Sequence, residues 1–323
     1  MRTLHRALVA TAMLAAATTI TYAQDDYPSK PIRIVVPLPP GGSNDVLARV
    51  LGNEMAEAFG QPVLVENRPG AAGNIGTDHI AKSAPDGYTL GIAPNQTAAV
   101  NPVLYSKLPF DASQDLTGVS MLARVPMILV VNGKSEIQSL DDVIQHAKAN
   151  PSRLTYASAG AGSPQHMSAE IFQSLTNTDL THVPYKGSAP ALIDVLSGTV
   201  DIMFCPINSA LSYVQDGRLK ALGVTSTKRL ENLPDVPAIA ESIPEFESDI
   251  WIGLIAPAGT PPDILQKLNA ELNRSLSLPA VRKTLAEQGI EAEASTVEAF
   301  DQLMAADRLR WGEVIRRANI QVD

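Results

Sequence analysis

The chain has 323 residues, of which 45% are hydrophobic, and its 34 acidic residues outnumber its 25 Lys and Arg, giving a net charge of −9. This length usually means two domains with separate cores, and the acidic balance argues against nucleic acid or an anionic membrane as a partner. The one cysteine, Cys205, excludes an internal disulfide, and its apolar surroundings predict a buried thiol in a strand.

The first 23 residues have the three-part layout of a secretory signal peptide. Arg2 and Arg6 precede an apolar run at 7–20, and small residues around Ala23 offer a cleavage point. The run is shorter than the roughly 20 residues that a membrane span requires. We therefore predict an exported, soluble chain that begins near Gln24.

Strands and helices alternate through the next part of the chain. Runs rich in β-branched residues and stretches with helical periodicity follow one another. In order they are a strand at 30–37, a helix at 44–60, a strand at 62–67, a helix at 77–84 and a strand at 87–94. This order predicts a parallel sheet with helices on its faces.

A second α/β block follows a long β-rich stretch at 120–132, which Pro126 interrupts. The predicted helices are 139–150, 166–176 and 189–198, the strands are 154–160, 180–185, 200–206, 219–226 and 251–259, and the final helices are 261–277, 279–289 and 297–318. We take the stretches near 121–131 and 249–256 as crossings between lobes. The predicted fold is therefore two α/β lobes joined by two crossing strands, with lobe 1 at 24–124 plus 247–323 and lobe 2 at 125–246.

Three strand ends combine glycine, hydroxyl and amide residues, at 39–45, 94–97 and 158–166. The first N–H groups of a helix have no intrahelical partner, and the helix dipole adds partial positive charge there. Such a turn can hold a carboxylate or phosphate without lysine or arginine. The alternative is a plain strand-to-helix turn capped by Ser43 or Asn44. Two lobes that close about a hinge would bring the turns to one cleft.

Catalytic and metal motifs are absent from the sequence. It contains no complete dinucleotide fingerprint, no ATP-binding loop and no nucleophile elbow, and its histidines are too scattered for a metal site. Several residues keep two interpretations. His166 either faces the cleft or caps and packs, Asp45 either supports its helix or contacts a ligand, and Tyr185 either flanks a ligand or packs under its loop. A hydrolase using Ser163 with His166 is the enzymatic alternative.

Six strings of the sequence form a specific set. They are VPLPPGGSNDVLAR, VENRPGAAGNIGTDHIAKSAPDGYTLGIA, YASAGAGSPQHMSAEIF, HVPYKGSAPALIDVLSGTVDIMF, TSTKRLENLPDVPAIAES and WIGLIAPAGTPPDILQKLN. Together they resemble the extracytoplasmic solute receptors of tripartite tricarboxylate transporters, also called Bug receptors after the Bordetella uptake genes. The resemblance covers about 27–320, and departs from the family pattern at Gly118 and Ser212, where proline is common.

The resemblance implies a type II periplasmic binding protein that closes over a carboxylate held by main-chain groups and ordered waters. The implied ligand-binding residues are Pro40, Gly41, Gly42, Ser43, Asp45, Asn95, Gln96, Ser158, Ala159, Gly160, Gly162, Ser163, His166 and Tyr185. It also implies no catalysis, no cofactor and no metal. The expected partners are a small carboxylate and the permease subunits of a tripartite tricarboxylate transporter, with the receptor itself a monomer. A ligand sensor that signals to a membrane partner is the remaining alternative.

Overall fold

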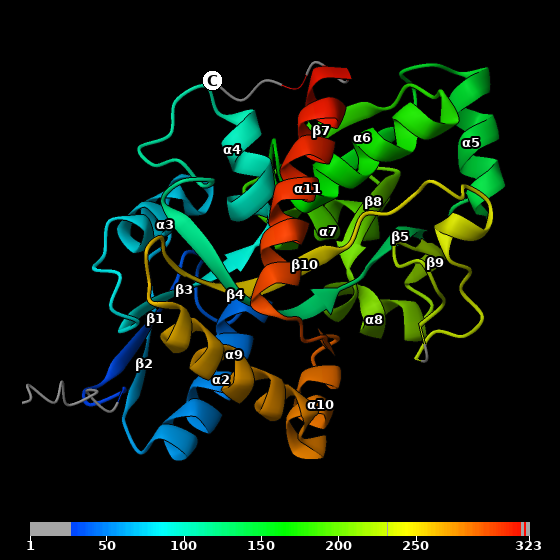
Figure 1. Cartoon of the computed structure of the whole chain (residues 1–323). Helices are drawn as coiled ribbons and strands as arrows, with labels where there is room; N and C mark the ends of the chain where they lie inside the picture. Colours follow the sequence, from blue (N-terminus) through cyan, green and yellow to red (C-terminus); the bar gives the residue numbers. More distant parts are fainter. Residues whose placement is uncertain (1–26, 231, 318–319, 321–323) are drawn as a thin grey trace, which may run out of the picture.

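The computed structural model describes residues 27–230, 232–317 and 320 (Figure 1). The expected signal peptide, at 1–23, lies outside these residues. Within them, no helix combines the length and the apolar character that crossing a membrane requires.

The first sheet contains strands from both ends of the described chain and has the order β11-β4-β10-β3-β1-β2. Its members are β1 (Ile32–Val36), β2 (Val63–Asn67), β3 (Thr89–Pro94), β4 (Leu116–Val125), β10 (Ile250–Pro257) and β11 (Glu291–Ala292). β1 lies between β2 and β3 and pairs with both in parallel, whereas β10 runs antiparallel to β3 and β4. The sheet is therefore mixed, with a parallel half that carries its carboxyl ends on one edge.

Helices cover both faces of this sheet, which explains why adjacent residues of β1, Ile34 and Val35, are both apolar and buried. Ile34 packs into a core with α2, α9 and α10, whereas Val35 packs into another with α3, α4 and α11. The helices are α2 (Ser43–Phe59), α3 (Asn74–Ala81), α4 (Asn101–Leu104), α9 (Pro262–Ser277), α10 (Pro279–Ala286) and α11 (Val297–Arg317).

The second sheet has the order β7-β6-β8-β5-β9 and is also covered on both faces. β5 shows the alternation, because Leu129 packs towards α5 and α6 while Ile128 packs towards α7 and α8. The elements are β5 (Met127–Asn132), α5 (Leu140–Ala149), β6 (Thr155–Ser158), α6 (Pro164–Thr176), β7 (Thr181–Pro184), α7 (Ser188–Ser197), β8 (Ile202–Pro206), α8 (Ile207–Gln215) and β9 (Leu219–Val224).

Two segments cross between the sheets and are joined through the Thr225 side chain. Pro126 separates β4 of the first sheet from β5 of the second, and residues 247–249 lead back into β10. Thr225 links them: its hydroxyl accepts from the Met127 N–H at 2.9 Å and donates to Asp249 Oδ1 at 2.9 Å. The predicted architecture of two α/β lobes joined by two crossing strands is confirmed.

Two helical segments differ from the sequence prediction. α8 follows β8 at once, with Pro206 as its N-cap residue, so no loop composition separates strand from helix. After β3 the chain forms a short π-helix, η2 (Gln96–Val100), that continues into α4. Both segments begin at the carboxyl ends of strands.

The contact between Gly253 and Phe300 predicts a paired effect on stability. A Cβ on Gly253 would lie 2.0 Å from Phe300 Cζ, so Gly253→Ala should lower the free energy of unfolding by about 1–3 kcal/mol. Gly312 in α11 has room, since the nearest atom to an added Cβ is 3.9 Å away, and Gly312→Ala should raise stability by about 0.5–1 kcal/mol. Urea-induced unfolding measures both; equal effects would contradict the packing described.

Candidate functional site

The predicted site residues lie at the carboxyl edges of the parallel strands. The turn at 37–42 follows β1, and Asn95 follows the neighbouring strand β3. In the other lobe the turn at 159–163 follows β6, Tyr185 follows β7 and Asn208 follows β8, and both strands pair with β6 in parallel. Because carboxyl ends of parallel strands share one edge, each lobe gathers its turns at one place.

Contacts across the lobe boundary bring these two edges together. Asn208 Nδ2 of α8 donates to Ser43 Oγ at the start of α2, at 3.2 Å. A Cβ on Gly162 would lie 2.4 Å from Leu104 Cδ2 of α4. Each turn therefore touches the opposite lobe, and the described structure has its lobes in contact.

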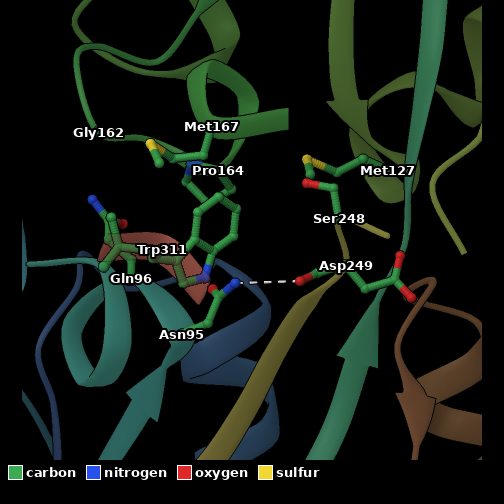
Figure 2. A pocket seen from close by; sticks show the side chains of 10 residues that line it. Asn95, Gln96, Met127, Gly162, Pro164, Met167, Ser248, Asp249 and Trp311 are labelled. Carbon is green, nitrogen blue, oxygen red and sulfur yellow. Dashed lines mark hydrogen bonds between the residues drawn. The ribbon is translucent and has the colours of Figure 1, made fainter. Parts of the chain in front are cut away.

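A small cavity of about 10 Å³, room for about one water molecule, lies between the lobes (Figure 2). It is lined by Asn95, Gln96, Val100, Met127, Gly162, Pro164, Met167, Ser248, Asp249 and Trp311. Three predicted residues, Asn95, Gln96 and Gly162, are thus brought together. The other predicted residues do not line it and belong to the two turns and their supports: Pro40, Gly41, Gly42, Ser43, Asp45, Ser158, Ala159, Gly160, Ser163, His166 and Tyr185.

Asn95 has a buried oxygen without a partner. Its side chain is 3% exposed, and its Nδ2 donates to the Asp249 carbonyl at 3.2 Å, as drawn in Figure 2. Its Oδ1 has no hydrogen-bond partner among the described residues. A buried unpaired polar atom costs roughly 1–3 kcal/mol. A water or a ligand donor in the cavity would remove that penalty.

The first-lobe turn is held from its own helix. The Gly41 N–H donates to Asp45 Oδ2 at 3.0 Å, and Arg49 binds the same carboxylate at 2.9 Å. The hydrogen bond from Arg49 holds the pKa of Asp45 below its ordinary value. Gly41 has φ +87°, and a Cβ on Gly41 or Gly42 would meet nothing within 4 Å. The geometry therefore favours the supporting role of Asp45, and leaves the glycine backbone open to approach.

The second-lobe turn is held by side chains beneath it. Ser158 Oγ accepts from the Gly160 N–H at 3.0 Å, and His166 Nδ1 accepts from the Gly162 N–H at 3.0 Å. Gly160 and Gly162 have φ of +123° and +73°, which other L-residues rarely adopt. Ser163 is the N-cap of α6, where its Oγ accepts from the His166 backbone N–H at 3.4 Å.

The structure shows the hydrogen-bond partners of the residues in two open interpretations, the Ser163–His166 hydrolase and the role of Tyr185. A hydrolase would need the Ser163 hydroxyl on the His166 ring, but the ring nitrogen Nδ1 accepts from Gly162 instead. The Tyr185 hydroxyl donates to Asp194 of α7 at 2.5 Å, and burial, with Asp194 beside it, raises the pKa of Tyr185 to about 12. Its backbone N–H donates to the Ser158 carbonyl, which ties the loop at 185–187 to the second-lobe turn.

The apolar lining of the cavity and Asp249 were not predicted from the sequence. Met127 and Asp249 come from the crossing segments. In the sequence, Met127 directly follows the Pro126 interruption and Asp249 precedes the strand predicted at 251–259, so these signals could have indicated their position between the lobes. Met167 and Trp311 come from helices, where their spacing indicates only core packing. Burial raises the pKa of Asp249 above its ordinary value, which favours its neutral form. Within the described part of the chain, no group of three or more His, Cys, Asp or Glu is placed to hold a metal ion.

A family model described as "Tripartite tricarboxylate transporter family receptor" matches residues 47–320. The chain belongs to this family. The protein BugT of Bordetella pertussis is 39% identical to it over 316 residues, which cover 97% of this chain and 96% of BugT.

Two solved structures show the same two-lobed fold. A Rhodopseudomonas palustris protein with adipate has a TM-score of 0.81 and 33% identity, covering 91% of this chain and 99% of its own. MatC from Rhodopseudomonas palustris, with bound malate, has a TM-score of 0.77 and 32% identity, covering 90% of this chain and 100% of its own. The expected family and fold are confirmed.

The contact of Gly162 with Leu104 predicts a change in lobe separation. Gly162→Ala adds a Cβ at 2.4 Å from Leu104 Cδ2 and at φ +73°, so we expect the lobes to move apart. Small-angle X-ray scattering should then give a larger radius of gyration. Leu104→Ala in the same chain removes the collision and should restore the wild-type value, with Leu104→Ala alone as the control. Unchanged scattering from Gly162→Ala would contradict a closed contact at this point.

Proposed function

We propose that this chain is a periplasmic receptor that closes over a small carboxylate-bearing solute and delivers it to the membrane subunits of a tripartite tricarboxylate transporter. Family membership and the related structures with adipate and malate support the ligand class. The observation that carries the proposal is the meeting of two glycine turns at the lobe boundary, each beside the start of a helix.

Neutral donors carry the proposed recognition. Among the described residues that line the cavity there is no lysine, arginine or histidine. The carboxylate would accept hydrogen bonds from N–H groups at the starts of α2 and α6, directly or through water, and from the amide of Gln96. Asn95 Oδ1 would accept from a bridging water or from a donor group of the ligand. Each charge-assisted bond contributes about 1.5–3 kcal/mol, so three of them approach the roughly 8 kcal/mol of micromolar binding.

Loading requires the lobes to separate, because a cavity of about 10 Å³ cannot admit a dicarboxylate. The crossings at Pro126 and 247–249 are the connections about which we propose that lobe 1 (24–124 plus 247–323) and lobe 2 (125–246) move. The Thr225 side chain joins both crossings and would keep their spacing constant during that motion. Binding proceeds without chemistry in this account, because the Ser163 hydroxyl serves as a helix cap.

Isothermal titration calorimetry against a panel of di- and tricarboxylates, amino acids and aromatic acids tests the ligand class. We expect micromolar binding of at least one carboxylate. The uncharged diamide of a dicarboxylate that binds should bind at least about 100-fold more weakly, because it loses the charge-assisted bonds. Binding of carboxylate-free compounds alone would contradict the proposal.

A charge change in the cavity tests the position of the site. Gln96→Glu keeps the shape of the side chain but places a negative charge beside the proposed carboxylate, and should weaken binding by at least tenfold, since like charges a few Å apart repel by more than about 1.4 kcal/mol. Gln145→Glu, at an exposed position on α5, is the matched control and should bind as wild type does. Equal affinities for the two variants would place the site elsewhere.

A further inference from the structure

Three rings form a stack behind the second-lobe turn. Tyr156 of β6 lies 4.7 Å from His182 of β7 between ring centroids, and His182 lies 4.1 Å from His166 of α6. The planes are nearly parallel, at 9° and 5°. The stack joins two strands, β6 and β7, to one helix, α6, beside the second-lobe turn.

The Gly162 bond selects one state of the His166 ring. Nδ1 accepts from the Gly162 N–H at 3.0 Å, so this nitrogen carries a lone pair and the ring proton is on Nε2. Nε2 lies 3.6 Å from Glu170 Oε1. Glu170 Oε1 also accepts from the Tyr156 hydroxyl at 2.7 Å and from Gln173 at 2.9 Å, so the carboxylate is fixed in place.

The second imidazole attaches to the start of the same turn. His182 Nε2 lies 2.6 Å from Ser158 Oγ, and Ser158 Oγ accepts from the Gly160 N–H. Ser158 is fully buried, so its hydroxyl serves the turn rather than solvent. One histidine therefore holds the Ser158–Gly160 half of the turn and the other holds Gly162.

We propose that neutral His166, held against His182 and Glu170, is the positioning group of the second-lobe turn, and that a proton on its Nδ1 releases the turn and weakens ligand binding. The part concerning the turn stands on the contacts above, whereas the part concerning the ligand rests on the proposed function. From the sequence, His166 had either a cleft-facing or a capping and packing role, and His182 had none.

The surroundings of the ring give the sign of the effect. A proton on Nδ1 would point at the Gly162 N–H. Two donors would then face each other, and the hydrogen bond between them would be lost. The groups around the ring are Glu170 on α6, Tyr156 on β6 and His182 on β7. From α11, which packs on α6, Arg317 binds Ser174 Oγ further along that helix.

The neighbours of His166 keep their charge states as the pH falls. Burial, and secondarily the charge of His166, lowers the pKa of His182 to about 4, so His182 stays neutral over most of the range in which imidazoles titrate. Burial opposes ionisation of Glu170, but the bonds from His166 and Tyr156 hold its pKa below the ordinary value. A proton added to His166 Nδ1 would break the bond from the Gly162 N–H, so the protein that carries this proton should bind the ligand more weakly.

NMR of the ligand-free protein tests the turn directly. Over a titration from about pH 8 to about pH 5, the Gly162 amide should shift with the same midpoint as the ring nitrogens of His166. In His166→Asn, whose Oδ1 replaces Nδ1 as a non-titrating acceptor, the Gly162 amide should stay in place. A Gly162 amide that does not move while His166 titrates would overturn the proposal, whether or not any solute binds.

The binding arm uses adipate as the probe. The affinity of the wild type should fall more steeply than that of His166→Asn, by up to about tenfold for each pH unit, and protonation of adipate contributes equally to both. His166→Phe, which fills the space without an acceptor, should bind weakly at every pH, and exposed His146→Asn on α5 should behave as wild type. Identical pH profiles for wild type and His166→Asn would overturn the proposal, whereas absence of adipate binding together with a moving Gly162 amide would count against the proposed function instead.

Discussion

The proposed site depends on hydrogen-bond donors of the backbone. The carboxyl ends of the parallel strands in the two sheets bring these donors together across the lobe boundary. A helix start presents N–H groups without intrahelical partners, and here one such start follows β1 and another follows the β6 turn. Glycine at 41, 42, 160 and 162 keeps side chains away from these groups. An anion can then be held by neutral donors, which agrees with a cavity lining that has no lysine or arginine among the described residues.

Holding such turns in shape requires support from behind, and the two lobes achieve it differently. In lobe 1 the support is ionic, since Asp45 bridges Gly41 and Arg49. In lobe 2 it is aromatic and titratable, since His166 and His182 each bind one half of the turn. The lobes also share one apolar core that includes Phe204, Trp251 and Trp311, so the contact across the boundary is not only polar.

The alternation of strands and helices, and the Pro126 interruption, predict two α/β lobes and their crossings because each depends on local residue patterns. Asn95, Gln96 and Gly162 could be predicted as site residues because they lie in the segments that follow β3 and β6. α8 could not, since β8 runs into it through Pro206 without loop residues. Trp311 and Met167 lie on helices. The spacing of apolar residues there predicts that these side chains are buried, but it does not identify the element that they pack against. Residue type alone could not predict the pairing of Asp45 with Arg49 or of Tyr185 with Asp194, because both partners are set by the fold.

A crystal structure of the protein with a bound dicarboxylate tests the central claim most directly. The account predicts one carboxylate between the lobes. Its oxygens should lie about 3 Å from bridging waters or from the N–H groups that are not already bonded within the two turns, at 42–44 and at 161. A carboxylate held by one lobe only, or paired with a lysine or arginine away from these turns, would contradict it.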